Sequence, residues 1–307
     1  MFDMMKNRTL KEITPAYIFA ACICHFRPLA KRLSDETLIK IIHRGYVGKK
    51  LDLDNPKTYT EKLNWLKLYD RKPLYTTLVD KYEVKKYVAE RIGEQHIIPT
   101  YGVWESFDDI NFESLPDQFV LKCTHDSGGL VIVKNKKELD KLSAKKVIEN
   151  SLKRNFYIQN REWVYKDVKP RIIAEKYMQD EKTNELRDYK FFCFNGVPKV
   201  LFVATGRQTN GPFFDFFDMD YNHLDIINGH PNASEIPEKP ITFDEMKSIA
   251  KVLSQGFPHI RVDLYEINGV VYFGEITFYH FGGWVPMKPL KWETIFGDWL
   301  ELPNKTN

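Results

Sequence analysis

The most constraining feature of the sequence is the segment HIRVDLYEINGVVYFGEITF, residues 259–278, in which two apolar runs flank an Asn-Gly dipeptide. Runs rich in Val, Ile, Tyr and Phe around Asn-Gly are typical of an antiparallel β-hairpin. Such a hairpin is stable only when further strands or a helix cover its apolar face. The same strands carry Arg261, Asp263 and Glu275, and a charge in mid-strand must be paired or exposed. The segment therefore predicts part of a larger sheet with charges gathered on it.

The length of the hairpin loop decides on which face these charges lie. A two-residue turn with regular pairing would place Asp263 and Glu275 on opposite faces of the sheet. We predict instead a three-residue loop, 267–269, with a glycine bulge. This register pairs Arg261 with Glu275 and brings Asp263 and Thr277 to the same face.

Two carboxylates on one concave sheet face, with an arginine between them, are typical of a magnesium site that a nucleotide completes. Asp263 and Glu275 would be the ligands. The alternative interpretation is an ordinary cross-strand salt bridge on a solvated sheet.

A second chemical signal lies in the segment FVLKCTHDSGG, residues 119–129. Lys122 interrupts an apolar strand, and an ammonium in that position needs an anion. The turn that follows contains Gly128 and Gly129, whose backbone N–H groups suit phosphate oxygens. A surface lysine beside a hairpin turn is the alternative. No established phosphate-loop, zinc-protease or nucleophile-elbow motif occurs in the sequence.

The composition is that of a globular protein with 307 residues, of which 43% are hydrophobic, 14% aromatic and 28% charged. Its 45 basic and 42 acidic residues give a net charge of +3, so we predict no nucleic-acid partner. The four cysteines are irregularly spaced, which indicates reduced thiols in a cytoplasmic protein.

The apolar segment AYIFAACIC, residues 16–24, is too short to span a bilayer, which takes about 20 residues. One interpretation is a buried helix. The other is an interfacial helix whose following basic residues, Arg27, Lys31 and Arg32, contact lipid head groups at the membrane surface.

The rest of the chain mixes helical and strand patterns, which predicts an α+β protein. Residues 34–73 and 80–93 read as helices, with Ser34 and Asp80 as N-caps. Residues 188–203 read as a hairpin around a second Asn-Gly turn. The segment 280–286 contains two glycines and a tryptophan that could shape an acceptor pocket, a tight turn being the alternative.

The order of these features resembles the ATP-grasp superfamily, as in D-alanine:D-alanine ligase. Asp80 and Lys81 open a helix, Lys122 precedes a Gly-rich turn, AEKYM surrounds Glu175, and the hairpin follows. More narrowly, the segments NPKTYTEKLNWLKLYDRKPLYTTLVDKY, IPTYGVW and LPDQFVLKCTHDSGG resemble the TupA-like ATP-grasp family of teichuronopeptide and other surface-polysaccharide gene clusters.

The resemblance implies an ATP-grasp fold, in which two α/β lobes clasp ATP. Residues 1–78 would form a helical N-terminal region and residues 79–178 the lid lobe. Residues 179–307 would form the C-terminal lobe with the metal site.

The resemblance also implies residue roles. Lys81 and Lys122 would hold the nucleotide phosphates under a flap formed by 126–129, and Glu175 would accept from the adenine amine. The acid that binds the ribose is either Glu185 or Asp188. The implied ATP site comprises Lys81, Lys122, Asp126, Ser127, Gly128, Gly129, Glu175, Lys176, Tyr177, Met178 and Asp188.

Arg261 and Lys122 would stabilise charge in the reaction, while Asp263 and Glu275 bind Mg²⁺. The family's ligases usually carry Asn where this chain has Thr277, whose hydroxyl would be a weaker Mg²⁺ ligand, which puts a two-metal arrangement in doubt. The implied activity is an ATP- and Mg²⁺-dependent carboxylate-amine ligase that acts through an acyl phosphate on a small molecule or polysaccharide precursor, with a uronic acid as the expected carboxylate and an amino acid or other amine as its partner. The alternatives are a kinase that phosphorylates a sugar or small acceptor and a non-catalytic nucleotide-binding subunit of the polysaccharide machinery.

Overall fold

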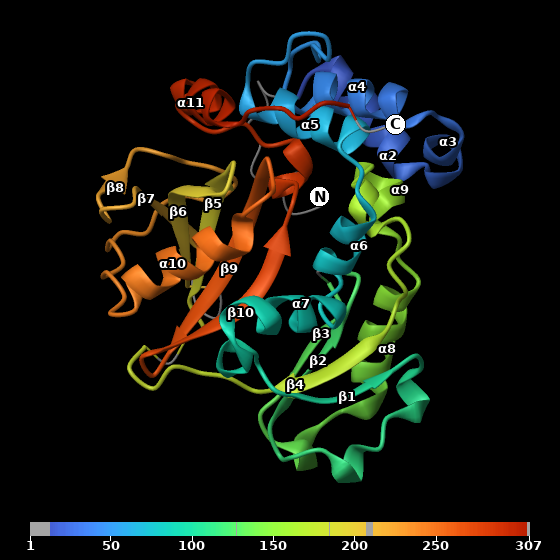
Figure 1. Ribbon diagram of the computed structural model, residues 1–307. Coiled ribbons are helices and arrows are strands. Elements are labelled where there is room, and N and C mark those ends of the chain that lie inside the picture. Colours follow the sequence, from blue (N-terminus) through green and yellow to red (C-terminus); the bar gives the residue numbers. More distant parts are fainter. Residues whose placement is uncertain (1–12, 127, 184, 207–210, 306–307) are drawn as a thin grey trace.

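The computed structural model describes residues 13–126, 128–183, 185–206 and 211–305. Two antiparallel sheets lie side by side, and helices from the first third of the chain cover one end of the molecule (Figure 1). The predicted α+β class is confirmed by these helices and sheets.

The smaller sheet has four strands in the order β1-β4-β2-β3. Its strands are β1 (Thr100–Trp104), β2 (Phe119–Cys123), β3 (Leu130–Val133) and β4 (Ile172–Lys176). The alternate residues Phe119, Leu121 and Cys123 are fully buried because they face helix α8 (Lys141–Leu152). This layer has a hydrophobic core of its own, while the opposite face of β2 presents Lys122.

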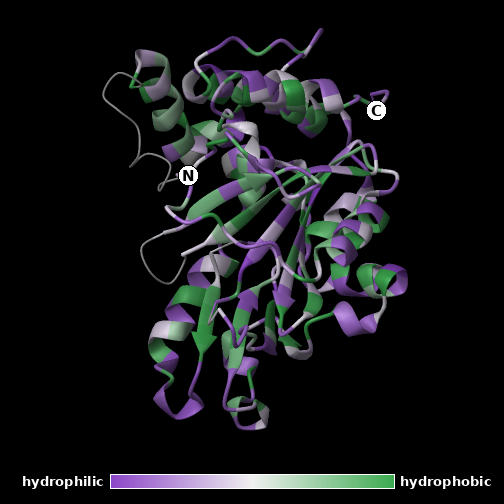
Figure 2. Ribbon diagram, turned by 90° about the vertical axis from the view of Figure 1, so that its left-hand side faces the viewer, coloured by the Kyte–Doolittle hydropathy of each residue, from purple (hydrophilic) through white to green (hydrophobic). Residues whose placement is uncertain are grey.

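The larger sheet has six strands in the order β10-β9-β5-β6-β7-β8. Its strands are β5 (Asp188–Phe194), β6 (Val197–Thr205), β7 (Phe213–Phe217), β8 (His223–Leu224), β9 (His259–Ile267) and β10 (Val270–Thr277). Helix α10 (Phe243–Ser254) packs against β5, β6 and β9. Hydrophobic stretches occupy much of these strands (Figure 2), and β5 is buried along its whole length.

The hairpin β9/β10 forms, but the predicted three-residue loop is wrong. Ile267 pairs with Val270 across a two-residue turn whose Asn268 and Gly269 have φ of 51° and 76°. These left-handed values are those of the type I′ turn that Asn-Gly favours. The extra residue lies instead at Gly274, where the register shifts between Phe273 and Glu275. A bulge within the strand thus restores the shared face that we attributed to the loop.

The N-terminal helices are α2 (Pro15–His25), α3 (Arg27–Arg32), α4 (Asp35–Tyr46), α5 (Tyr59–Tyr69), α6 (Pro73–Val79) and α7 (Glu83–Ile92). Ser34 caps α4, and Thr58 forms a capping box with Glu61 at the start of α5. Gly45 lies inside α4, where an added Cβ would be 2.5 Å from Ala20 Cβ on α2. Close packing of α2 on α4 therefore requires this glycine.

The remaining elements are short. They are two helices, α9 (Phe156–Asn160) and α11 (Lys291–Trp299), and the 3₁₀ turns η2 (Glu94–His96), η3 (Phe107–Asp109), η4 (Phe112–Ser114), η5 (Lys136–Glu138), η6 (Trp163–Tyr165) and η7 (His280–Gly283). In the described ranges no helix has the length and apolar character that crossing a bilayer requires.

One hydrophobic core extends from the N-terminal helices into the larger sheet. It includes Tyr59 and Leu63 of α5, Phe192 of β5 and Phe296 of α11. The ring centroids of Tyr59 and Phe296 are 5.3 Å apart. The helical region and the larger sheet are therefore packed as one body, while the boundaries at residues 78 and 178 stay predictions.

Candidate active site

The hairpin brings together the four polar side chains predicted to share one face. Its register pairs Asp263 with Glu275 and Arg261 with Thr277. The Arg261 guanidinium donates from Nε and Nη2 to the two oxygens of Asp263, each at 2.7 Å. The same Nη2 lies 3.1 Å from Thr277 Oγ1 and 3.5 Å from Glu275 Oε1. The predicted convergence of these residues on one face is confirmed, whereas the predicted pairing of Arg261 with Glu275 is wrong.

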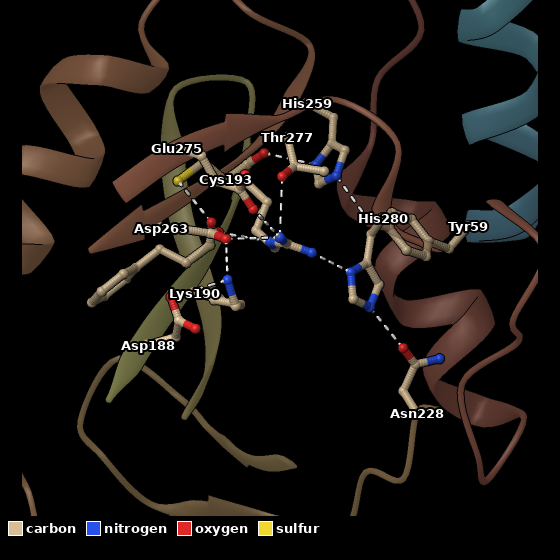
Figure 3. A network of polar contacts seen from close by, with 12 residues as sticks. Tyr59, Asp188, Lys190, Cys193, Asn228, His259, Asp263, Glu275, Thr277 and His280 are labelled. Carbon is tan, nitrogen blue, oxygen red and sulfur yellow. Dashed lines mark hydrogen bonds and ion pairs between the residues drawn. The ribbon is translucent and has the colours of Figure 1, made fainter. Parts of the chain in front are cut away.

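Lys190 of β5 belongs to this cluster, although the sequence did not reveal it. It lies opposite Asp263 in the sheet, is 5% exposed, and donates to Asp263 Oδ2. Its Nζ is also 3.3 Å from Asp188 Oδ1, and Figure 3 shows Lys190 between these two acids. A buried ammonium needs such partners. The alternation of Asp188 and Lys190 in the aromatic strand DYKFFCF was the available signal.

Glu275 is the acid of this cluster that is open to solvent, with 38% of its side chain exposed. Burial opposes its ionisation, but the cations of Lys190, Lys81 and Arg261 hold the pKa of the carboxyl at about 2. Glu275 is therefore fully ionised at neutral pH and available to a further cation.

His280 orients Arg261 from the side opposite Asp263. Arg261 Nη1 lies 2.7 Å from His280 Nδ1, and His280 Nε2 lies 2.7 Å from Asn228 Oδ1. Because a guanidinium only donates, Nδ1 is the acceptor and Nε2 carries the proton. Burial, followed by the charge of Arg261, lowers the pKa of His280 well below its ordinary value. The ring is therefore neutral and locks the guanidinium in place.

His259 makes stability depend on pH. It is 1% exposed, and burial lowers its pKa to about 3. In the unfolded chain its pKa returns to about 6.5, so below that pH the unfolded state binds a proton that the folded state does not bind. The folded state therefore becomes less stable as the pH drops below about 6.5. In His259→Gln we expect the loss of unfolding free energy between pH 7.5 and 5 to be smaller by about 2 kcal/mol. Urea unfolding of both proteins at both pH values measures this difference, and parallel curves would contradict it.

A cavity of about 300 Å³ lies between the two sheets, lined by residues of both. The predicted residues among those lining it are Lys122, Lys176, Tyr177, Met178, Glu185 and Asp188. Glu185 and Asp188 both line the cavity, so position alone does not choose between them as the ribose-binding acid. The apolar walls Val120, Ile132 and Tyr265 suit a flat aromatic ring.

Glu175 adjoins this cavity through its lysine partners. Its carboxylate lies 2.6 Å from Lys122 Nζ and 2.5 Å from Lys85 Nζ. Burial opposes ionisation, but the two lysines keep the pKa of Glu175 below its ordinary value. Lys85 was not foreseen, and the expected contact of Glu175 with adenine stays a prediction.

A second cavity, of about 280 Å³, is lined at the hairpin by Arg261, Glu275 and Thr277 and across from it by Lys81. The predicted roles of Gly282 and Trp284 in shaping a pocket agree with their place in its wall. The salt-bridge chain Asp188, Lys190, Asp263, Arg261 connects the two cavities.

Polar groups line this second cavity or lie directly behind its wall. Within the described residues, Trp284 Nε1 is buried and has no hydrogen-bond acceptor. Glu162, 5% exposed, accepts from Asn160 Nδ2 at 3.0 Å. Lys67 Nζ lies 3.7 Å from the Trp284 ring centroid. Burial lowers the pKa of Lys67 to about 7, although the negative charge of Glu162 acts to raise it. The cavity thus suits a polar ligand with donor and acceptor groups.

The turn expected to cover the phosphates is only partly described. Ser127 lies outside the described residues. The Asp126 carboxylate accepts from Ser151 Oγ and lies 3.5 Å from Arg154, so it is directed at α8 rather than at a cavity. Lys81 donates to the Asp126 carbonyl at 2.8 Å. At Gly129 an added Cβ would approach Ser151 Oγ to 2.4 Å, so the turn packs closely only with glycine there.

The donor set at the hairpin fits Mg²⁺ held together with phosphates. Across the described part of the chain, no three His, Cys, Asp or Glu side chains are grouped as a complete metal site. Mg²⁺ usually takes one or two protein carboxylates and completes its shell with phosphate oxygens and water. Glu275 supplies one open carboxylate, whereas Asp263 is 0% exposed and both of its oxygens are engaged by Arg261 and Lys190, so it could bind Mg²⁺ only if those contacts rearranged.

Comparison with curated proteins gives no significant match. Among solved structures, D-alanine–D-alanine ligase from Bacillus anthracis complexed with ATP is similar, with 15% identity and a TM-score of 0.37 over 71% of this chain and 55% of that chain. The chain thus spans about half the length of that ligase.

Two further structures are similar over 79% of this chain. D-Alanine–D-alanine ligase from Helicobacter pylori has 16% identity and a TM-score of 0.45, with 69% of that chain covered. L-Amino acid ligase from Bacillus licheniformis has 15% identity and a TM-score of 0.42, with 55% covered.

A family model described as TupA-like ATPgrasp matches residues 61–301. Because this match covers most of the chain, the protein belongs to the TupA-like ATPgrasp family.

Proposed function

We propose that the protein is an ATP- and Mg²⁺-dependent ligase that joins an amine to a carboxylate through an acyl phosphate. The observation that supports this most strongly is the pair of cavities joined by the charged chain from Asp188 to Arg261. One cavity has the apolar walls and lysine that a nucleotide needs, and the other has the cations and open carboxylate that a phosphoryl acceptor needs.

In this proposal each residue has a role set by its charge. Lys122 and Lys81 bind phosphate oxygens, and Arg261 neutralises charge on the carboxylate as it attacks the γ-phosphate. Asp263 and Glu275, with Thr277 as a weaker ligand, would hold Mg²⁺, which supplies Lewis-acid stabilisation of the phosphoryl oxygens when bound. No side-chain nucleophile is needed.

The amine then attacks the acyl carbon of the acyl phosphate and displaces phosphate. The overall products are an amide, ADP and phosphate. We propose the second cavity as the place of this exchange, because Glu162 and Trp284 Nε1 offer an acceptor and a donor beside Arg261. The family's link to surface polysaccharides makes a uronic acid the expected carboxylate and an amino acid the expected amine.

Incubation with ATP, Mg²⁺ and a panel of uronic acids, with and without hydroxylamine, tests the proposal. Hydroxylamine displaces phosphate from an acyl phosphate and leaves a hydroxamate, so mass spectrometry should detect that product together with ADP and phosphate. A stable phosphorylated sugar would instead indicate a kinase. ATP binding without turnover across the panel would favour a non-catalytic nucleotide-binding subunit.

Lys122→Ala should weaken ATP binding. Lys122 lines the first cavity and pairs with Glu175, and loss of one hydrogen bond to a charged group corresponds to an increase in Kd of about 10- to 100-fold. Isothermal titration with ATP and Mg²⁺ measures the change. Lys146→Ala, which removes an exposed lysine of α8, is the matched control. Equal ATP affinity in both variants would exclude Lys122 from the nucleotide site.

A further inference from the structure

Helix α2 is apolar on two sides, although only one of them is covered. Its buried residues are Tyr17, Ala20, Ile23 and Cys24. On the other side Ile18 is 52% exposed and Phe19 58% exposed. Most residues of α2 fall in the hydrophobic half of the colour range in Figure 2. A helix that is apolar all round normally has its whole surface covered.

The exposed apolar side continues beyond α2. Phe26, between α2 and α3, is 61% exposed, and Leu29 of α3 and Ile13 before α2 are each 42% exposed. We call this set, Ile13, Ile18, Phe19, Phe26 and Leu29, the N-terminal apolar face. Exposed apolar residues that gather in this way mark an interaction surface, whereas single ones need no explanation.

Packing fixes the direction of this face. Ala20 Cβ lies where a Cβ on Gly45 would be only 2.5 Å away, so α2 and α4 touch closely at that point. The ring centroids of Tyr17 and Tyr46 are 5.1 Å apart on the same side. Turning Ile18 and Phe19 inward would undo both contacts, so these side chains stay outside.

The charge around the face is entirely basic in the described part of the chain before α4. Between Ile13 and Ser34 the sequence contains no Asp or Glu, while the side chains of Lys31 and Arg32 are exposed. The next acids are already paired: Asp35 lies 2.6 Å from Arg71 and 3.2 Å from Arg161, and Glu36 lies 2.5 Å from Lys40.

We propose that the N-terminal apolar face binds the surface of an anionic lipid bilayer, with Phe19 and Phe26 inserted among the acyl chains and Lys31 and Arg32 at the head groups. Apolar side chains with a basic border have the chemistry of an interfacial membrane helix. A second copy of this chain fits less well, because a twofold contact would bring the same basic residues of both copies together.

This position relates the membrane to the second cavity. Arg161 donates to the carbonyls of Ala30 at 2.5 Å and Leu33 at 3.1 Å, at the end of α3. It directly follows α9, whose Phe156 and Asn160 line the second cavity. Helices α2, α3 and α9 lie together in Figure 1. The helices that carry the N-terminal apolar face are therefore bonded directly to a segment that lines that cavity.

Sedimentation of the full chain with phosphatidylcholine vesicles, with and without phosphatidylglycerol, tests the proposal and requires no knowledge of the substrate. We expect binding that increases with phosphatidylglycerol and weakens as salt is added. Phe19→Glu/Phe26→Glu should lower the partition constant by about tenfold or more, since it removes apolar insertion and adds negative charge.

Leu142→Glu/Ile241→Glu is the matched control, because it makes the same change of charge at residues that are 83% and 87% exposed away from this face. This control should bind vesicles like the unmodified chain. Lys31→Gln/Arg32→Gln should lose the dependence on phosphatidylglycerol, and it provides a second test if the phenylalanine variant fails to fold.

Three outcomes would overturn the proposal. The first is no binding of the unmodified chain to anionic vesicles. The second is equal binding by the Phe19→Glu/Phe26→Glu variant and its control. The third is a dimer in light scattering that this variant dissociates, together with no vesicle binding, which would assign the face to a second copy. ATP affinity should be the same in all variants, so a failure here is separate from a failure of the proposed ligase activity.

Discussion

Glu275→Gln should abolish measurable turnover of ATP, a loss of about 10³-fold or more. Glu275 is the open carboxylate of the hairpin, and three cations keep it ionised with a pKa of about 2. A neutral amide of the same shape cannot supply that charge to Mg²⁺. Because 38% of the side chain is exposed, solvent screens its interactions with the three cations, so we expect the loss of unfolding free energy to be small beside the loss of turnover.

The carboxylate substrate is first identified with the hydroxamate assay. ADP release with that substrate then measures turnover, and thermal unfolding of the same samples measures stability. Glu90→Gln serves as the matched control, since Glu90 is an exposed acid of α7 and should leave both activity and stability unchanged. Full activity in Glu275→Gln would remove this residue from the metal site. A large drop in melting temperature would point to a structural role instead.

Lys190→Met should lower the unfolding free energy by about 3–5 kcal/mol, which is the usual cost of removing one partner from a buried ion pair. Lys190 is 5% exposed and contacts both Asp263 and Asp188, which are 0% and 1% exposed. Without the ammonium, Asp188 and Asp263 lie buried close together with one cation fewer to compensate them. Urea unfolding at pH 7.5 measures the loss.

Lys199→Met is the control for this prediction. Lys199 is an exposed lysine of the neighbouring strand β6, and its replacement should change stability by no more than about 0.5 kcal/mol. If Lys190→Met and Lys199→Met unfold at the same urea concentration, the ammonium of Lys190 contributes nothing to holding the acids together.

The sequence determined the local structure and the family because these depend on short-range chemistry. Ser34 caps a helix and Asn195-Gly196 forms a two-residue hairpin turn, with φ of 49° and 78°, as predicted. The ATP-grasp fold that the ordered motifs implied is confirmed by the family match over residues 61–301. Alternation along β9 was sufficient to place Arg261 and Asp263 on one face, but not to bring Glu275 of β10 to it.

Only the tertiary structure decided how that face is completed. The bulge at Gly274 depends on how β10 pairs with β9, so no short-range signal specified it. Lys85 has ordinary sequence surroundings, and the aromatic strand around Lys190 does not reveal its partner. The roles of both lysines arise because the sheets bring Asp263 and Glu175 to them from distant parts of the chain. The face of α2 that is left uncovered was fixed by its packing on α4. Pairing across sheets and helices is set by the sum of many contacts, which periodicity along one strand or helix does not contain.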